Sequence, residues 1–377
     1  MDVPEFTEHW KYIIFILACT FTLIQTLYYI LIFSRLAFYN NKPRSITQTH
    51  AVSVIICARD EAENLVTNVP GTLVQAYRST HEVVLVNDNS FDESKYILEE
   101  LRKSFRQLQV VELTQEAKMI PGKKFPLSIG IKTAKHEILL MTDADCVPAT
   151  ENWIESMQSN YDDTTEIVLG YGAFHKKKGL LNKLIRWETF HTALQYFSYA
   201  LAGMPYMGVG RNLSYKKSLF FKHKGFSSHN NIPGGDDDLF INKAATAHNT
   251  RINIAKESFT LSKAADTWKQ WRAQKARHYT TSRFYKPVYK MLLGLYALSH
   301  FLIYPLVFIT IIFYNWKYGL ALLGLRLIIQ SVVYIRAMIK LDERDLIPYF
   351  IIFDIWMFFY YLLFSTSLLK KPKASWK

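Results

Sequence analysis

The sequence predicts an α/β domain with a mostly parallel sheet, flanked by transmembrane helices. Between about Pro43 and Pro287, short apolar strand-like runs alternate with helical stretches, and charges occur throughout. This alternation is typical of βαβ units, which build parallel sheets. On both sides of this segment stand long apolar runs of the length that a helix needs to cross a bilayer.

The strands are expected in a regular order along the globular segment. The first is the β-branched run Ala51–Ala58, which breaks into a charged loop at Arg59-Asp60-Glu61. The second, Glu82–Val86, ends in Asn87-Asp88. A strand at Gln109–Leu113, a helix at Leu127–Ala134 and a strand at Glu137–Met141 follow. Short apolar runs bounded by polar residues suit buried parallel strands.

The flanking segments divide the chain into three parts. Tyr12–Phe33 is uncharged and strongly apolar, and Met291–Trp316 and Pro348–Leu369 are similar. Tyr318–Ile335 is a weaker span because it carries Arg326. We therefore expect an N-terminal anchor (1–42), a globular domain (43–287) and a C-terminal membrane region (288–377) with two or three spans. Charges inside spans are costly, so Arg326 and Asp354 are expected to pair.

The distribution of charge predicts where the globular domain lies. Acids precede the first span and bases follow it, at Asp2, Glu5 and Glu8 and at Arg35, Lys42 and Arg44. The positive-inside rule then places the globular domain in the cytoplasm, anchored in the inner or plasma membrane. The basic tail at 370–377 agrees only if one C-terminal segment does not cross, or else the rule fails there.

Composition also limits the partners. The formal charge of +13 is spread along the chain without an aromatic and basic recognition pattern, which argues against nucleic acid. Anionic lipid head groups and phosphorylated substrates are better matches. The three cysteines have no metal-site spacing, which is consistent with a reducing compartment.

Carboxylates follow three of the expected strands. They are Asp60 and Glu61 after the first, Asp88 after the second, and Asp143 with Asp145 after the fourth. Strand ends of parallel sheets meet at one edge, where ligands bind. Asp143 and Asp145 could share a hard cation, Mg²⁺ or Mn²⁺. The alternative is that each acid only ends a strand or caps a helix.

Two later segments add charged groups. Gly234-Gly235 precedes Asp236-Asp237-Asp238, more acids than capping needs, and one of them could be a general base. Trp268–Tyr279 is basic and aromatic. Its Arg and His residues suit a diphosphate, and a juxtamembrane helix on anionic lipid is equally consistent. The stretch Leu184–Tyr206 is expected to be an interfacial helix, with Trp187, Tyr196 and Tyr199 at head-group depth, or else an aromatic core helix.

The order of these motifs over about residues 50–280 resembles the membrane-integrated family-2 glycosyltransferases, relatives of cellulose, hyaluronan and chitin synthases and of ceramide glucosyltransferase. The matching pieces are Asp88, Asp143-Ala144-Asp145, Gly235-Asp236-Asp237-Asp238-Leu239 and Gln274-Lys275-Ala276-Arg277-His278. The resemblance implies a nucleotide-diphospho-sugar transferase domain of the glycosyltransferase-A type.

The resemblance also implies roles for these residues. Asp60, Glu61 and Asp88 would hold the base and ribose of a nucleotide sugar, usually a UDP-sugar, and Gly122-Lys123 is similar to the family's nucleotide loop. Asp143 and Asp145 would bind the donor diphosphate through the metal. Gly210-Arg211-Asn212-Leu213 resembles a segment that lines the acceptor side. Gln274, Arg277 and His278 would lie over the diphosphate and the acceptor entrance. Asp236 would be the general base, with Asp237 as second choice.

The expected function is therefore an inverting, metal-dependent sugar transfer to a membrane-associated lipid or glycan acceptor, in cell-wall or glycolipid biosynthesis. The alternatives are a processive polysaccharide synthase and a non-enzymatic membrane scaffold or transport component. His278 stands where the family has tryptophan, and Gly235 where it has an acid. Both departures argue against long-chain processivity.

Overall fold

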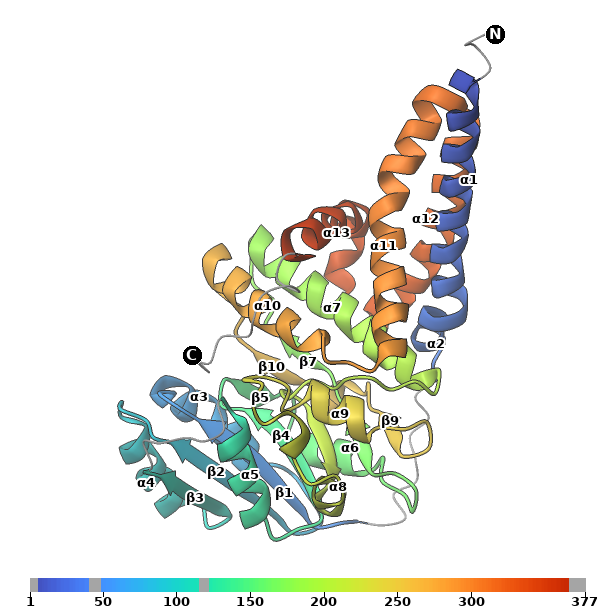
Figure 1. The fold of residues 1–377 in the computed structure, drawn as a ribbon. Helices are drawn as coiled ribbons and strands as arrows, with labels where there is room; N and C mark the ends of the chain where they lie inside the picture. The colour runs from blue at the N-terminus through green and yellow to red at the C-terminus, as the bar shows by residue number, and fades with distance from the viewer. Residues whose placement is uncertain (1–5, 41–48, 115–121, 366–377) are drawn as a thin grey trace. The chain divides into compact units, whose positions relative to one another are not determined.

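The computed structural model describes residues 6–40, 49–114 and 122–365, and the chain divides into two compact units (Figure 1). Met1–Tyr39 and Tyr285–Leu369 belong to one unit, and Asn40–Phe284 makes up most of the other. The expected domain boundary at residues 42 and 43 and the basic tail at 370–377 lie outside the described residues.

A seven-stranded sheet with the strand order β3-β2-β1-β4-β8-β6-β9 forms the centre of the unit Asn40–Phe284. The β1–β2, β2–β3, β1–β4 and β6–β9 pairs are parallel, and β8 runs antiparallel to both of its neighbours. A second sheet has the order β5-β10-β7. The strands are β1 (Val52–Ala58), β2 (His81–Asp88), β3 (Leu108–Leu113), β4 (Ile138–Asp143), β5 (Cys146–Pro148), β6 (Ile167–Leu169), β7 (Gly172–Phe174), β8 (Leu213–Lys216), β9 (Thr250–Ile252) and β10 (Thr260–Ser262).

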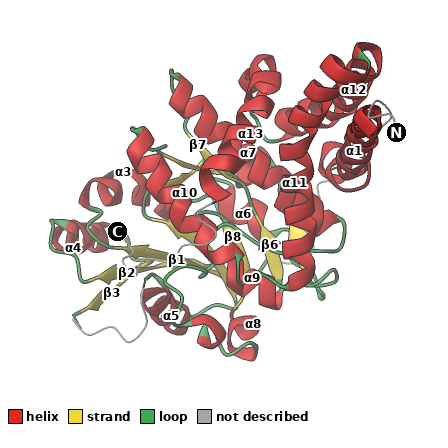
Figure 2. Ribbon diagram, turned by 45° about the horizontal axis from the view of Figure 1, so that its top comes forward, coloured by secondary structure: helices red, strands yellow, loops and turns green. Residues whose placement is uncertain are grey.

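Helices connect and cover these strands, as Figure 2 shows by colour. They are α3 (Ala62–Leu73), α4 (Ser94–Ser104), α5 (Lys124–Thr133), α6 (Trp153–Gln158), α7 (Leu180–Leu201), α8 (Lys217–Lys222), α9 (Asp238–Ala244) and α10 (Trp268–Ser282), with short 3₁₀ turns at Ser227–His229 and Lys256–Ser258. The four strands predicted from the sequence are all present. The predicted helix at Leu127–Ala134 begins three residues earlier, at Lys124.

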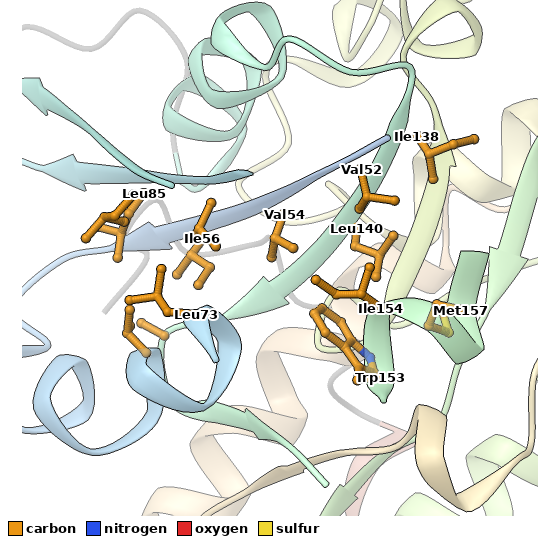
Figure 3. Close-up of a cluster of buried hydrophobic side chains, with 14 of the residues drawn as sticks. Val52, Val54, Ile56, Leu73, Leu85, Ile138, Leu140, Trp153, Ile154 and Met157 are labelled. Atoms are coloured by element: carbon orange, nitrogen blue, oxygen red, sulfur yellow. The ribbon is translucent and has the colours of Figure 1, made fainter. Parts of the chain in front are cut away.

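The parallel half of the sheet is buried on both faces, as expected of central parallel strands. All seven residues of β1 are buried. On one face, Val52, Val54 and Ile56 pack with Trp153 and other side chains of α3, α4 and α6 (Figure 3). On the other face α5 approaches so closely that a Cβ on Gly130 would lie 2.7 Å from the side chain of Ile55.

The register of the strands brings the predicted carboxylates to one edge. Cys57 of β1 pairs with Asp143 of β4 and with Val86 of β2, two residues before Asp88. Asp60 lies two residues after the end of β1. The acids predicted at three strand ends therefore share the carboxyl edge of the sheet.

The helix α7 is not the lipid-facing helix that was one of two predictions for this segment. Trp187, Tyr196 and Tyr199 are each at most 2% exposed. The same helix contains the buried Glu188, which forms an ion pair with Lys275 of α10. The alternative prediction, an aromatic core helix, matches the structure.

The other unit consists of helices. They are α1 (Phe6–Leu27), a π-helical turn at Tyr28–Phe33, α2 (Ser34–Ala37), α11 (Pro287–Ile309), a π-helical turn at Thr310–Tyr314, α12 (Trp316–Lys340), a 3₁₀ segment at Arg344–Tyr349 and α13 (Phe350–Ser365). Four candidate membrane spans occur among the described residues, at His9–Ala37, Pro287–Tyr314, Trp316–Lys340 and Arg344–Phe364. Three of them thus follow the globular segment, the upper end of the predicted range.

Arg326 and Asp354 pair inside this helical unit, as predicted. The Arg326 guanidinium donates to Asp354 over 2.8 Å, and both side chains are at most 1% exposed. Arg326 also donates to the hydroxyl of Tyr29 (3.1 Å), and Gln330 donates to the second oxygen of Asp354 (2.6 Å). The pair therefore ties α12 and α13 to the turn that follows α1.

Candidate functional site

Two carboxylates close the carboxyl end of β4. Asp143 is the last residue of the strand, and Asp145 lies at the turn before β5. Ligand atoms of Asp143, Asp145 and Cys146 all lie within 4.8 Å of one another. This spacing allows one ion to touch several of them.

The pKa values of the two acids shift in opposite directions because their neighbours differ. Burial alone would raise the pKa of Asp143, but the charges of Lys123, Arg211 and Arg277 outweigh it and lower that pKa. Burial and the charge of Asp143 raise the pKa of Asp145. The two carboxylates therefore repel each other when both are ionised, and a bound cation would offset this repulsion.

The donor set suits a hard divalent cation. Two carboxylates are the oxygen ligands that Mg²⁺ and Mn²⁺ prefer. The Cys146 thiol is buried and donates to Asp145 over 3.3 Å, and burial together with the neighbouring acids raises its pKa. A protonated thiol is a poor ligand, so Asp143 and Asp145 would hold the metal.

The loops after β1 and β2 are bonded to each other. Asp60 has a positive φ of 52°, its amide donates to Ser90 (2.9 Å), and its carboxylate accepts from the amide of Phe91 (2.8 Å). Glu61 accepts from Asn64 over 2.5 Å. Asp88 is fully buried at the end of β2. Sequence reasoning placed these acids at one edge, but it gave no indication that Asp60 also links the two loops.

Lys123 joins the nucleotide-loop motif to the metal pair. It lies at the N-terminus of α5, and its ammonium pairs with the Asp143 carboxylate. It also lines a small cavity together with Gly210, Tyr215, Asp236 and Asp237. The lysine of the predicted nucleotide loop and the predicted base therefore line the same cavity.

The three consecutive acids before α9 have different surroundings. Asp237 caps the helix, and its two oxygens accept from the amides of Gly210 and Asp238, each over 2.7 Å. Asp238 is buried and accepts from Thr281 of α10 (2.5 Å). Asp236 lines the cavity beside Lys123 and is partly exposed. Of the two predicted bases, only Asp236 is not committed to capping.

Burial and the charges of Asp236 and Asp238 raise the pKa of Asp237 to about 8. Asp237 therefore carries a proton at neutral pH, which weakens it as a base there. The raised pKa therefore favours Asp236, the first predicted base, over Asp237, the second.

The segment Gly210-Arg211-Asn212 has two roles. Asn212 is fully buried, accepts from Trp153 (3.1 Å) and donates to two backbone carbonyls, so it stabilises the fold. Arg211 lies 4.2 Å over the Phe174 ring and donates to Ser262 (3.0 Å). Its charge acts on both metal-site acids. Sequence reasoning named Arg211 only as part of the segment that resembles the acceptor side, and it did not predict the effect of Arg211 on these two acids.

The basic helix α10 contributes its three predicted residues on one face, because Gln274, Arg277 and His278 are spaced by three and four residues. The charge of Arg277 acts on Asp143. Desolvation in the site and the charges of Lys275, Arg277 and Arg211 lower the pKa of His278 well below its usual value. His278 is therefore a neutral ring at physiological pH.

Comparison with solved structures defines the class of fold. The chain is similar to the mannosyltransferase PcManGT from Pyrobaculum calidifontis, solved in complex with GDP-Man and Mn²⁺, with a TM-score of 0.62 and 18% identity over 95% of this chain and 98% of that one. At this identity the likeness shows the fold. It is a glycosyltransferase-A type α/β fold with a mostly parallel sheet, flanked by long apolar helices, as predicted.

The sequence comparisons indicate the family. Residues 53–225 match the model of glycosyl transferase family 2. A probable glycosyltransferase, YdaM of Bacillus subtilis (strain 168), is 24% identical over 262 residues, which cover 64% of this chain and 58% of the relative. The chain thus spans less than two thirds of that relative's length.

Proposed function

We propose that the protein is a glycosyltransferase that moves a sugar from a nucleotide sugar to a membrane-associated lipid or glycan acceptor, with inversion at the anomeric carbon and with a divalent cation. One observation carries the proposal. Within a single unit, Lys123 pairs with Asp143 of the Asp143–Asp145 pair and also lines one small cavity together with Asp236.

The donor side follows from charge. Asp143 and Asp145 would hold Mg²⁺ or Mn²⁺, which when bound neutralises the departing diphosphate. Lys123, Arg211 and Arg277 supply positive charge around the same acids. Asp60, Glu61 and Asp88 would hold the base and ribose. The Pyrobaculum structure contains GDP-Man with Mn²⁺, which supports a nucleotide-sugar donor and a metal here.

The transfer step needs one base and a leaving group. Asp236 takes the proton of an acceptor hydroxyl, and the acceptor oxygen forms a bond to the anomeric carbon. The bond between that carbon and the diphosphate oxygen breaks, and its electron pair leaves with the diphosphate. Because attack and departure occur on opposite faces, a single step inverts the centre. A positioned base of this kind contributes roughly 10²- to 10⁴-fold to the rate.

The acceptor is proposed to be membrane-associated because four described helices are long and apolar enough to span a bilayer. The positive-inside asymmetry supports a cytoplasmic location of the transferase unit. The neutral ring of His278 in place of the family's tryptophan supports transfer of single sugars.

The test is release of nucleoside diphosphate by the detergent-solubilised full chain from a panel of UDP- and GDP-sugars, with Mn²⁺ or Mg²⁺ and with or without lipid acceptors. The proposal predicts metal-dependent release from at least one donor, stimulated by an acceptor. An absence of both release and binding for every donor would reject it.

A further inference from the structure

Lys124, the residue after the lysine of the predicted nucleotide loop, is fully buried. Its ammonium donates to three backbone carbonyls, those of His229 (2.8 Å), Gly234 (2.5 Å) and Ile232. An ammonium has three protons, so each N–H has one carbonyl partner. All three carbonyls belong to residues 229–235, called the acid loop below, which leads directly to Asp236.

A second side chain completes the internal bonding of the acid loop. The His229 ring is buried, and burial and the charge of Lys124 lower its pKa to about 4, so it is neutral. Because a carbonyl can only accept, the Nε2 that lies 2.9 Å from the carbonyl oxygen of Gly235 carries the proton and donates it. Lys124 and His229 together bind four carbonyls of a loop that has few backbone partners of its own.

The start of α5 also fits the acid loop sterically. Gly122 has a φ of +78°, and a Cβ at this position would lie 2.1 Å from the carbonyl oxygen of Pro233. Gly122 thus allows the two segments to touch. Lys123, between Gly122 and Lys124, pairs with Asp143. Three consecutive residues therefore contact both the metal pair and the loop that carries the base.

A buried charge is expensive, and an apolar side chain would pack here at lower cost if only the volume mattered. What an apolar side chain cannot do is bind three carbonyls that turn inward from an irregular loop. The lysine therefore fixes the path of the acid loop rather than filling space.

We propose that Lys124 is a positioning residue, which holds the acid loop so that Asp236 lies where it can take the proton of the acceptor hydroxyl. This inference deepens the proposed function and rests on it for its catalytic consequence. Lys123 then contacts the proposed donor site, whereas Lys124 binds the acid loop.

The first test is independent of turnover. Lys124→Met keeps the length and removes all three donors, and Lys132→Met changes an exposed lysine of the same helix as the matched control. Hydrogen–deuterium exchange of the full chain in detergent is expected to rise at least tenfold in peptides covering 229–237 for Lys124→Met only. Unchanged exchange in these peptides would contradict the proposal that Lys124 holds the acid loop. If Lys124→Met does not fold, Lys124→Gln, which keeps two N–H donors, takes its place with a smaller expected rise.

The second test separates positioning from general damage. Misplacing a catalytic group by about 1 Å costs roughly 10²-fold in rate, so Lys124→Met should lower kcat by about that factor while donor KM and nucleoside diphosphate affinity stay within twofold. In an Asp236→Asn background the same substitution should have no further effect on kcat, because two residues that act as a unit are not additive.

The outcomes are distinct. If the wild-type chain releases no diphosphate from any donor, the proposed function is rejected. Hydrogen–deuterium exchange then still tests whether Lys124 holds the acid loop. A wild-type chain that turns over, with Lys124→Met at full kcat or with an equal loss in both backgrounds, rejects positioning and leaves the function intact.

Discussion

At the scale of single residues, three neighbouring acids have the same chemistry and different surroundings. Asp237 and Asp238 are bonded by amides and by Thr281, whereas Asp236 lines the cavity with Lys123. We therefore predict that Asp236→Asn lowers kcat by roughly 10²- to 10⁴-fold, with donor affinity nearly unchanged. The measurement is turnover beside calorimetric binding of the nucleotide. An equal loss of nucleotide affinity would contradict the role of Asp236 as base.

A second residue-scale prediction concerns pH. The pKa of Asp237 is about 8 in the fold and 3.8 as an unperturbed group, so folding binds a proton in this window. The resulting stabilisation is complete below about pH 4 and is lost as the pH rises through about 8. Asp237→Asn cannot ionise. The Tm advantage of wild type over this variant, in metal-free detergent buffer, should therefore shrink between pH 5 and pH 9; a constant difference would show that Asp237 does not titrate there.

The residues that sequence reasoning found are those with a chemical signature. Asp143 with Asp145 and Asp236 stand out because acids follow three strand ends of one predicted sheet and because three acids in a row are more than capping needs. Lys124 could not be found this way, because its partners are carbonyls more than a hundred residues away and every residue has one. A backbone partner leaves no trace in the sequence.

At the scale of elements, the first half of the sheet was predictable and the second half was not. The strands β1, β2 and β4 are six to eight residues long and apolar, and their burial on both faces gives continuous apolar runs. The strands β6 and β9 have three residues each, too few for a periodic pattern, and they exist through pairing with distant partners. The antiparallel insertion of β8 follows from the same long-range pairing.

The helical elements offer a further prediction. Removing one partner of a buried ion pair typically costs about 3–5 kcal/mol, so Arg326→Asp alone and Asp354→Arg alone should each lower the Tm in detergent markedly. The double swap restores opposite charges, but an arginine at 354 loses the bond to Tyr29. Partial recovery is therefore expected. A double variant no more stable than the additive sum of the two would show that the pair is not coupled.

At the scale of the whole molecule, the chain contains a glycosyltransferase-A type unit and a set of long apolar helices. The sequence predicted both parts, because one rests on alternating strands and helices and the other on hydropathy, and each signal extends over tens of residues. How the donor is chosen depends on a few contacts around base and sugar, and such contacts have no comparable pattern. The resemblance favoured a UDP-sugar, whereas the similar solved structure holds GDP-Man.

The central claim is that Asp143 and Asp145 hold the cation to which a donor diphosphate binds. The most direct measurement is calorimetric titration of the full chain with UDP and with GDP, with Mn²⁺ and with EDTA. Wild type and the exposed-acid control Asp163→Asn should bind one of these two nucleotides, and this binding should require Mn²⁺. The double variant Asp143→Asn, Asp145→Asn should lose that metal-dependent binding. Unchanged affinity and metal dependence in the double variant would contradict the claim.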